Sequence, residues 1–392
     1  MDTGRGNLKA SYVKTKLTLS FSSALTPSLS PSASLLGSRG SDLNLSTDVL
    51  SEKLQGLRPL FRRFFPERVA SDFTIVIATY NSEDRLGKVL DCLRCQIDTS
   101  DIVWEIIVVD NNSTDSTAQV VERYQANWPK SIPLRYAFES QQGAGYARQL
   151  GTRLANSPLV GYLDDDNFPW INWVRTAYRF GKQNPNIGVY GSRIRGKFLS
   201  SPPPNFERIA ALLALTDRGS KPIPYRPEAK VLPPGAGLVV RRRAWLENVP
   251  EERTLAEKFG DREAGEDLEV VLRIQRAGWP VWYNANMWMH HEIPGSRLTR
   301  AYLTTLCKGI GLSRYHTRML SFAPWQRPFV ILPYALNDTR KILRHLLHYR
   351  QQILTDTVAA SEMMLYAASL VSPLHSWYRQ LARYFIALKR PC

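Results

Sequence analysis

Leu159-Val-Gly-Tyr-Leu-Asp-Asp-Asp166 is the stretch on which our prediction of the fold rests. Its strand-forming first half leads directly into three aspartates. A continuous apolar run of this length is typical of a strand that is buried on both faces of a parallel sheet. The same arrangement occurs at Phe73–Asn81 and Trp104–Asp110, where an apolar, β-branched run also ends on polar residues.

Segments with apolar residues at helical spacing separate these predicted strands. They span Leu86–Leu93, Ser113–Gln125 and Tyr146–Ala155, and a further helix is expected at Trp170–Gln183. Alternating strands and helices predict an α/β fold with a mainly parallel central sheet between two layers of helices. Ligands of such sheets bind at the carboxyl ends of the strands. The polar residues of interest in this chain lie at those ends.

The rest of the chain follows a less regular order. Further strands are predicted at Leu134–Phe138, Ile187–Ser192, Gly235–Arg241 and Trp279–Met287, and helices at Phe206–Leu215 and Glu266–Ala277. From Leu298 onward the pattern is helical, with breaks expected at four prolines: Pro324, Pro328, Pro333 and Pro373.

Charge is the unusual feature of the composition. The 392 residues are 44% hydrophobic and 22% charged, as in an ordinary globular protein, but the net charge is +16. Residues 296–392 hold 14 Lys and Arg and 3 Asp and Glu, a net charge of +11. Such a surface attracts the phosphates of nucleic acids, anionic lipids or phosphorylated substrates. The alternative is a solvated basic face without a specific partner.

Cysteine usage and hydropathy indicate the compartment. Cys92 and Cys95 form a Cys-x-x-Cys pair, but no further zinc ligands lie nearby and the segment has helical apolar spacing. We therefore predict that Cys92 and Cys95 are ordinary residues on the face of a helix. The scarcity of cysteine fits a reducing compartment. The sequence has no apolar run of about 18 residues and its start has no signal-peptide core, so we expect a cytoplasmic protein.

Residues 1–70 differ from the rest of the chain. They are rich in Ser and Leu, and Asp2 is the only acid before Gly40. We predict a disordered N-terminal extension. An organelle transit peptide has the same composition, and a start codon assigned too early is a third possibility.

The aspartates Asp164, Asp165 and Asp166 are the first candidate for chemistry. Adjacent carboxylates repel one another unless a cation or hydrogen-bond donors neutralise them. Mg²⁺ and Mn²⁺ prefer oxygen ligands and can bridge to phosphate. Alternate residues of a strand point the same way, so Asp164 and Asp166 are expected to share a face. The alternative is an acidic turn that caps the next helix.

The ends of two other strands provide candidate nucleotide contacts. Asp110 could accept hydrogen bonds from a base or a ribose, or it could cap the helix that follows. Thr79 and Asn81 could line a nucleotide pocket, and ordinary turn chemistry explains them equally well.

The segment Gly143-Ala-Gly-Tyr-Ala-Arg148 begins like a dinucleotide fingerprint, but Arg148 stands where the third glycine is required. A nicotinamide or flavin site is therefore rejected. Arg148 at the start of a helix is placed for an anion such as a pyrophosphate. A solvated surface arginine is the alternative.

Glu266, Asp267 and His291 complete the candidates. A carboxylate at Glu266 or Asp267 could act as a general base, although acidic residues are also favoured in the first turn of a helix. His291 follows a predicted strand, where an imidazole can bind a metal ion but is more often structural.

These pieces together resemble the inverting glycosyltransferase family 2, whose fold is the GT-A three-layer sandwich. The resemblance covers about Phe73 to Leu298 and depends on the order of the motifs, which are individually weak. They are Ile75–Asn81, Ile106–Asp115, Gly143 with Arg148, Tyr162–Asn167, Glu266-Asp267, and His291 with Ile293, Pro294 and Arg297. The chain also looks like the polysaccharide-assembly members of hormogonium polysaccharide type in cyanobacteria.

The resemblance implies a role for each candidate residue. Thr79, Asn81, Gly143, Arg148 and Glu266 would contact the nucleotide donor. Asp110 would hold the base, uracil or guanine, and Asp165 would lie near the ribose or the sugar. Asp166, with Asp164 and His291, would bind Mn²⁺ or Mg²⁺ on the diphosphate, and Asp267 would be the catalytic base.

The implied reaction is an inverting transfer from a UDP- or GDP-sugar to a saccharide or lipid-linked acceptor. The processive Gln-x-x-Arg-Trp signature is absent, and Gln149 stands where the family often has Asn, so we expect one sugar per encounter. Residues 71–298 would form the catalytic domain. Residues 299–392 would form a basic helical region, which could touch the anionic inner face of the plasma membrane or merely pack on the catalytic domain.

Two other functions remain as rivals. A nucleotidyltransferase of similar architecture would need a Gly-rich, basic loop after the first strand, where this chain has Ala78-Thr-Tyr-Asn81. A non-enzymatic protein that binds membranes or nucleic acid would explain the charge of +16, but not the aspartates Asp164–Asp166 and Asp267. We therefore expect no nucleic-acid partner.

Overall fold

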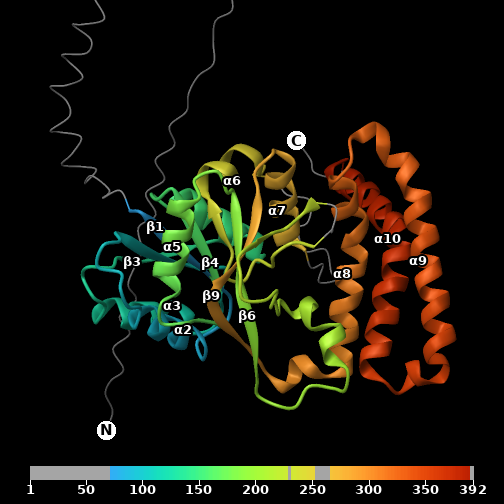
Figure 1. Ribbon diagram of the computed structural model, residues 1–392, viewed down its shortest axis with the longest axis horizontal. Helices are drawn as coiled ribbons and strands as arrows, with labels where there is room; N and C mark the ends of the chain where they lie inside the picture. The colour runs from blue at the N-terminus through green and yellow to red at the C-terminus, as the bar shows by residue number, and fades with distance from the viewer. Residues whose placement is uncertain (1–70, 228–230, 252–264, 389–392) are drawn as a thin grey trace, which may run out of the picture. The chain divides into compact units, whose positions relative to one another are not determined.

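The computed structural model describes residues 71–227, 231–251 and 265–388, and Figure 1 shows their arrangement. The predicted N-terminal extension, residues 1–70, lies outside the described residues. Within residues 67–392, which form one compact unit, helices and strands alternate through the first half and helices follow one another in the last part.

Four parallel strands form the first half of the sheet. They are β1 (Phe73–Thr79), β2 (Trp104–Asp110), β3 (Leu134–Phe138) and β4 (Leu159–Asp164), in the order β3-β2-β1-β4. All seven residues of β1 are buried, as are those of β2, because helices cover both faces of these strands. The prediction of buried parallel strands is confirmed here.

The second half of the sheet is mixed. Its strands are β5 (Asn167–Pro169), β6 (Val189–Phe198), β7 (Ile223–Pro224), β8 (Val239–Arg241) and β9 (Val281–Ile293). β8 joins β4 and β6 by antiparallel pairing, and β6 and β9 are parallel. β5 and β7 both pair antiparallel with β9. The expectation of a mainly parallel sheet therefore applies only to its first half.

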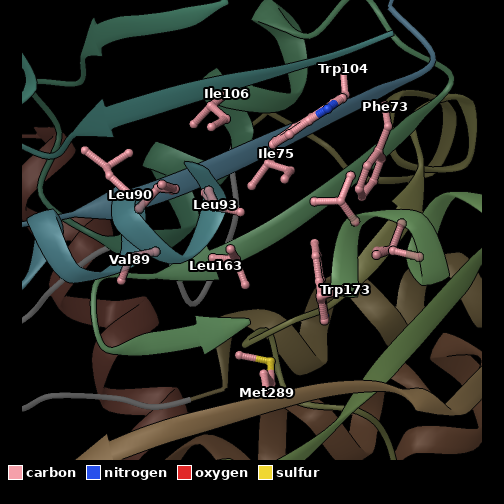
Figure 2. Close-up of a cluster of buried hydrophobic side chains, with 14 of the residues drawn as sticks. Phe73, Ile75, Val89, Leu90, Leu93, Trp104, Ile106, Leu163, Trp173 and Met289 are labelled. Carbon is pink, nitrogen blue, oxygen red and sulfur yellow. The ribbon is translucent and has the colours of Figure 1, made fainter. Parts of the chain in front are cut away.

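Helices cover the two faces of the sheet. On one face, α2 (Leu86–Arg94), α3 (Thr117–Ala126) and α5 (Trp173–Gln183) pack on the odd-numbered residues of β1. Figure 2 shows this cluster, to which Ile75, Leu90 and Trp173 belong. On the other face, α4 (Ala144–Leu154), α6 (Arg242–Asn248) and α7 (Glu266–Arg276) pack on the even-numbered residues. The result is the three-layer α/β arrangement that the sequence predicted.

β9 is longer than the sequence indicated. The strand was expected to end at Met287, but it continues to Ile293 because β5 and β6 pair with it on either side, at Asn167↔His291 and Gly196↔His291. His291 therefore lies inside a strand and not after one. Partner strands, which the local sequence does not reveal, determine this extension.

The last part of the described chain consists of three long helices, α8 (Arg300–Leu320), α9 (Arg327–Tyr349) and α10 (Thr357–Leu388). Two of the four expected proline breaks do not occur, because Pro333 lies inside α9 and Pro373 inside α10. The Ser372 hydroxyl donates to the Ser369 carbonyl at 2.6 Å, which is the acceptor that Pro373 leaves without an amide. Pro333 is exposed, so water can satisfy the carbonyl that it leaves free.

The predicted helix at Phe206–Leu215 is two short 3₁₀ turns, Phe206–Arg208 and Ala210–Leu213. The Cys-x-x-Cys segment is helical as predicted, with Cys92 in α2 and Cys95 as its C-cap. Among the described helices, none combines the length and the hydropathy needed to cross a membrane.

Candidate functional site

Parallel pairing brings the ends of β1, β2 and β4 to one edge of the sheet. Thr79 is opposite Asp110 in the pairing of β1 with β2, and Ala78 is opposite Asp164 in the pairing of β1 with β4. Residues that are 86 positions apart in sequence, such as Thr79 and Asp165, are therefore in contact. The sequence-predicted polar residues do gather where a parallel sheet binds its ligands.

Asp165 connects the acidic turn to the loop after β1. Its carboxylate accepts hydrogen bonds from the Thr79 hydroxyl at 3.3 Å and from the Ser82 hydroxyl. The Arg85 guanidinium forms an ion pair with it at 3.4 Å. Neither Ser82 nor Arg85 is among the site residues predicted from the sequence.

Asp110 holds the loop after β2. It is 3% exposed, and it accepts the Ser113 amide at 2.9 Å and the Tyr136 hydroxyl at 2.8 Å. Burial and this hydrogen bond raise the pKa of Tyr136, so its hydroxyl remains a donor. Asn81 has a left-handed backbone, with φ of 48°, and its side chain accepts the Thr114 amide at 2.8 Å. Asn81 thus takes part in a turn, the alternative that the sequence left open for it. Asp110 does not cap the following helix, because α3 begins at Thr117 with Ser116 as its N-cap.

The N-terminus of α4 is occupied by side chains of this chain. Gly143 has φ of 147°, a conformation that favours glycine, and its amide donates to the Asn111 side chain at 2.6 Å. The Gly145 amide donates to Glu266 at 2.5 Å. These contacts link the helix start to the loop after β2 and to α7.

Arg148 joins two candidate carboxylates. It is 6% exposed, pairs with Asp164 at 2.6 Å and also pairs with Asp267. The alternative of a solvated surface arginine is therefore wrong, because Arg148 lies on the buried face of α4. Asp267 also accepts the Gly235 amide at 3.0 Å. A Cβ at position 235 would lie 2.3 Å from the Asp267 carboxylate, so only glycine allows this close approach.

The charges of this cluster depend on one another. Burial would lower the pKa of Arg148, but Asp164 and Asp267 raise it, so the guanidinium remains protonated. Desolvation raises the pKa of Asp164, and Asp166 and Asp267 add to that shift, while Arg148 opposes it. Negative charge on Asp164 is thus less stable than on Asp166, whose pKa is lowered.

Asp166 has a different set of partners. It is 6% exposed, and it contacts the Arg297 guanidinium at 2.7 Å and His291 Nε2 at 3.4 Å. Burial would raise the pKa of Asp166, but His291 and Arg297 lower it to about 2, so the carboxylate is ionised. His291 Nδ1 lies 3.0 Å from the Leu213 carbonyl, which is consistent with Nδ1 donating and Nε2 facing Asp166.

The expectation that Asp164 and Asp166 share a face of a strand is wrong. β4 ends at Asp164, and Asp165 and Asp166 form a turn. The alternation of side chains therefore stops at Asp164. The three aspartates pair instead with three different arginines: Arg148, Arg85 and Arg297.

The side chains around Asp166 can be compared with the ligands that a divalent cation requires. Within the described residues, no three His, Cys, Asp or Glu side chains are grouped to hold a metal ion. Mg²⁺ and Mn²⁺ in phosphate sites need only one or two protein ligands and take water and phosphate oxygens besides. The ionised Asp166 carboxylate and the Nε2 of His291 fit that requirement. Arg297 supplies positive charge at the same carboxylate.

Sequence reasoning missed the roles of four residues: Ser82, Arg85, Gly235 and Arg297. Arg85 stands at the N-cap of α2, one turn beyond the end of β1, and that position was a usable signal. Arg297 belongs to the motif with His291, Ile293 and Pro294, but the sequence assigned no role to it and did not indicate its contact with Asp166.

Part of the chain is similar in sequence to known proteins. Residues 74–235 match the family model described as Glycosyl transferase family 2. The chain is 30% identical over 111 residues to the poly(ribitol-phosphate) beta-glucosyltransferase of Bacillus spizizenii, covering 28% of this chain and 17% of that protein. It is 36% identical over 93 residues to the validoxylamine A glucosyltransferase of Streptomyces hygroscopicus subsp. limoneus, covering 23% and 19%. The chain thus spans less than a fifth of the length of these two relatives.

A solved structure shows the same fold. The mannosyltransferase PcManGT from Pyrobaculum calidifontis, in complex with GDP-Man and Mn²⁺, superposes with a TM-score of 0.50 at 17% identity. The superposition covers 85% of this chain and 98% of that one.

Proposed function

The chain carries a family 2 glycosyl transferase domain of GT-A fold, and from this premise we propose that it is an inverting, non-processive glycosyltransferase. It transfers a hexosyl group from a nucleoside-diphosphate sugar to a hydroxyl of a saccharide or lipid-linked acceptor. The proposed setting is the synthesis of an extracellular polysaccharide. The enzyme would act in the cytoplasm, at the inner face of the plasma membrane.

One observation carries the proposal. Asp164 and Asp267 contact the same buried arginine, Arg148, from two elements far apart in sequence, at the carboxyl edge of the parallel strands. Transfer from a nucleotide sugar requires positive charge near the departing diphosphate and a carboxylate near the attacking hydroxyl. Arg148 and Asp267 supply both in one contact.

The residues proposed to bind the sugar-nucleotide donor lie at the strand ends and at the start of α4. Thr79, Asn81 and Asp110 would hold the nucleoside, UDP or GDP, at the ends of β1 and β2, with Asp165 beside the ribose or the sugar. Gly143, Arg148 and Glu266 would lie along the diphosphate at the start of α4. When the donor binds, its phosphates would contact Arg148 in place of the Asp164 and Asp267 carboxylates.

Asp166 and His291 would hold Mn²⁺ or Mg²⁺, with Asp164 nearby. When bound, such an ion would neutralise charge on the leaving diphosphate. Arg297 would then release part of its contact with Asp166 and remain as a second cation. Asp267, freed from Arg148, would accept the proton of the acceptor hydroxyl in a single displacement that inverts the anomeric centre.

Nucleotide binding tests the proposal. In calorimetry of the purified chain, one of UDP and GDP is expected to bind in the presence of Mn²⁺ and the other to bind at least about tenfold more weakly, a difference of about 1.4 kcal/mol. ADP is the control. Absence of heat for both UDP and GDP, with and without Mn²⁺, would contradict the proposed donor and leave only the fold assignment.

We propose an anionic membrane as a further partner, docked by the outer face of α9. Asp338 and His345 face the neighbouring helices and are buried, whereas Phe329, Leu336 and Leu347 on the opposite face are more than half exposed. An exposed apolar stripe of this kind on a helix marks a surface that another layer covers. Residues 324–354 contain five Lys and Arg and one acid, Asp338.

The charge of this face favours one of the partners that could bury it. Arg318 already neutralises Asp338, with contacts of 2.6 and 2.9 Å, so the outer face of α9 has cations and no exposed carboxylate. A second copy of this helix, or the basic residues 1–70 of the chain, would face it with like charge. An apolar stripe bordered by cations suits the headgroup layer of an anionic bilayer.

Vesicle flotation tests this docking face. The chain is expected to float with vesicles that contain phosphatidylglycerol and to remain unbound with phosphatidylcholine alone. Leu336→Glu with Leu343→Glu is expected to weaken binding at least about tenfold, because each buried leucine contributes about 1.5–3 kcal/mol. Leu246→Glu, at an exposed position of α6, is the matched control. Equal flotation of both variants, or dimerisation without vesicle binding, would exclude the proposal.

A further inference from the structure

A polar cavity lies between α5 and β9. Its volume is about 920 Å³, and it is lined by Arg175 and Arg179 of α5 and by Asn284, Asn286 and Trp288 of β9. Successive side chains of a strand point to opposite faces. His290 lines this cavity whereas His291 contacts Asp166, so the cavity opens on the other face of β9 from the candidate catalytic residues.

A large bulge in β9 forms one wall of the cavity. The pairing of β6 with β9 passes from Gly191↔Tyr283 to Arg193↔Trp288. Ser192 alone therefore stands opposite residues 284–287. Bulges redirect side chains and occur frequently beside functional sites. Here the bulge brings two asparagines, Asn284 and Asn286, to the cavity wall.

The Asn284 amide is buried without a complete set of partners. Its side chain is 1% exposed, its oxygen accepts the Asn286 backbone amide at 3.1 Å, and its Nδ2 has no hydrogen-bond acceptor among the described residues. An unsatisfied buried donor costs about 1–3 kcal/mol. A ligand oxygen in the cavity would satisfy it.

Two indole rings border the same space. The guanidinium groups of Arg193 and Arg195 each lie 4.2 Å from the centroid of the Trp288 ring. Trp170 is 53% exposed and meets the edge of His290 at a centroid distance of 6.1 Å. An indole offers a flat apolar surface together with a polar edge. That combination suits a pyranose ring, whose faces are apolar and whose rim is hydroxylated.

The hydrogen-bonding groups of the lining favour an acceptor-rich ligand. Arg175, Arg179 and Arg195 are donors only, and no lining residue is a carboxylate. Each of these arginines contacts one aspartate outside the lining: Asp98, Asp101 and Asp217 respectively. The cavity therefore supplies many hydrogen-bond donors, among them three guanidinium groups that suit carboxylate oxygens.

We propose that this cavity binds a saccharide that carries carboxylates, and that it is separate from the donor site. The half-exposed ring of Trp170 would contact a sugar ring, and Asn284 would donate to a carboxylate or hydroxyl oxygen. Arg179 and Arg195 would bind further carboxylates along the chain. The inference does not rest on the proposed transferase function, because the lining includes none of the residues assigned to the donor or to catalysis.

Calorimetry with defined oligosaccharides tests the site. Hexagalacturonate is expected to bind the full chain at least about tenfold more tightly than neutral maltohexaose, a difference of about 1.4 kcal/mol. Asn284→Asp and Arg179→Glu are each expected to weaken hexagalacturonate binding at least about tenfold. Arg179→Glu changes a half-exposed side chain, so it remains informative if Asn284→Asp impairs folding.

Two control variants separate binding in this cavity from general charge attraction and from binding at the donor site. Arg243→Glu, on the exposed face of α6, should leave the affinity unchanged. Asp267→Asn should also leave it unchanged, so loss of the proposed catalysis and loss of this site are distinguishable. Absence of hexagalacturonate binding, or equal binding by Arg179→Glu and Arg243→Glu, would overturn the inference. So would tighter binding of a single-stranded oligonucleotide that Arg179→Glu removes.

Discussion

Asp267→Asn is expected to slow release of the nucleoside diphosphate from the donor by a factor of about 10² to 10⁴. The substitution keeps the size of the side chain and keeps an oxygen to accept the Gly235 amide, which Asp267 accepts at 3.0 Å. It removes the carboxylate that we propose as the base for the acceptor hydroxyl. The measurement is the initial rate of transfer with the donor that calorimetry identifies.

Donor affinity separates loss of the base from loss of the site. The amide introduced by Asp267→Asn would no longer pair as an ion with Arg148, but Asp164 still holds that arginine at 2.6 Å. The variant should therefore bind the nucleoside diphosphate about as tightly as the unaltered chain. Glu247→Gln, at an exposed carboxylate of α6, is the matched control. A variant at Asp267 that keeps more than about a tenth of the rate would fall outside the range for a general base and exclude this role.

Asp166→Asn is expected to remove the effect of Mn²⁺ on nucleotide binding. A bound divalent ion contributes several kcal/mol to the stabilisation of phosphate charge, so its loss should weaken binding in Mn²⁺ at least about 100-fold, or about 2.7 kcal/mol. Binding without Mn²⁺ should change little, because Arg297 remains. The measurement is calorimetry of the matching nucleotide with and without the metal ion.

Stability must be measured on the same variant. Asp166 is 6% exposed and pairs with Arg297 and His291, so the substitution leaves a partly buried arginine without its carboxylate. A cost of about 1–3 kcal/mol in the free energy of unfolding is expected. His291→Gln serves as a second variant, since it leaves the Asp166–Arg297 pair intact. If Mn²⁺ still strengthens nucleotide binding to both variants, the metal assignment is wrong.

Much of the first half of the fold could be predicted from the sequence. The apolar runs at Phe73–Thr79 and Leu159–Asp164 have the composition that a doubly covered strand requires, and helical spacing identified the helices between them. Strand ends mark the ligand edge of a parallel sheet, so the sequence alone was enough to group Thr79, Asp110 and Asp164, which the strand pairing does bring together.

The second half depends on partners that are distant in sequence. β9 continues past Met287 because β5 and β6 pair with its last residues. Pro373 does not interrupt α10, because the hydroxyl of Ser372 satisfies the carbonyl of Ser369. Neither feature can be recognised from local propensity, which the tertiary environment often overrides.

By itself, the sequence determined which carboxylates stand at the ligand edge and the α/β order that brings them there, because periodicity and strand ends are local properties. Only the tertiary structure decided which cation each carboxylate contacts. Arg148, which also pairs with Asp164, reaches Asp267 across 119 positions of sequence, and Arg297 reaches Asp166 across 131. Ion pairs depend on distance in space, and folding, not spacing along the chain, sets that distance.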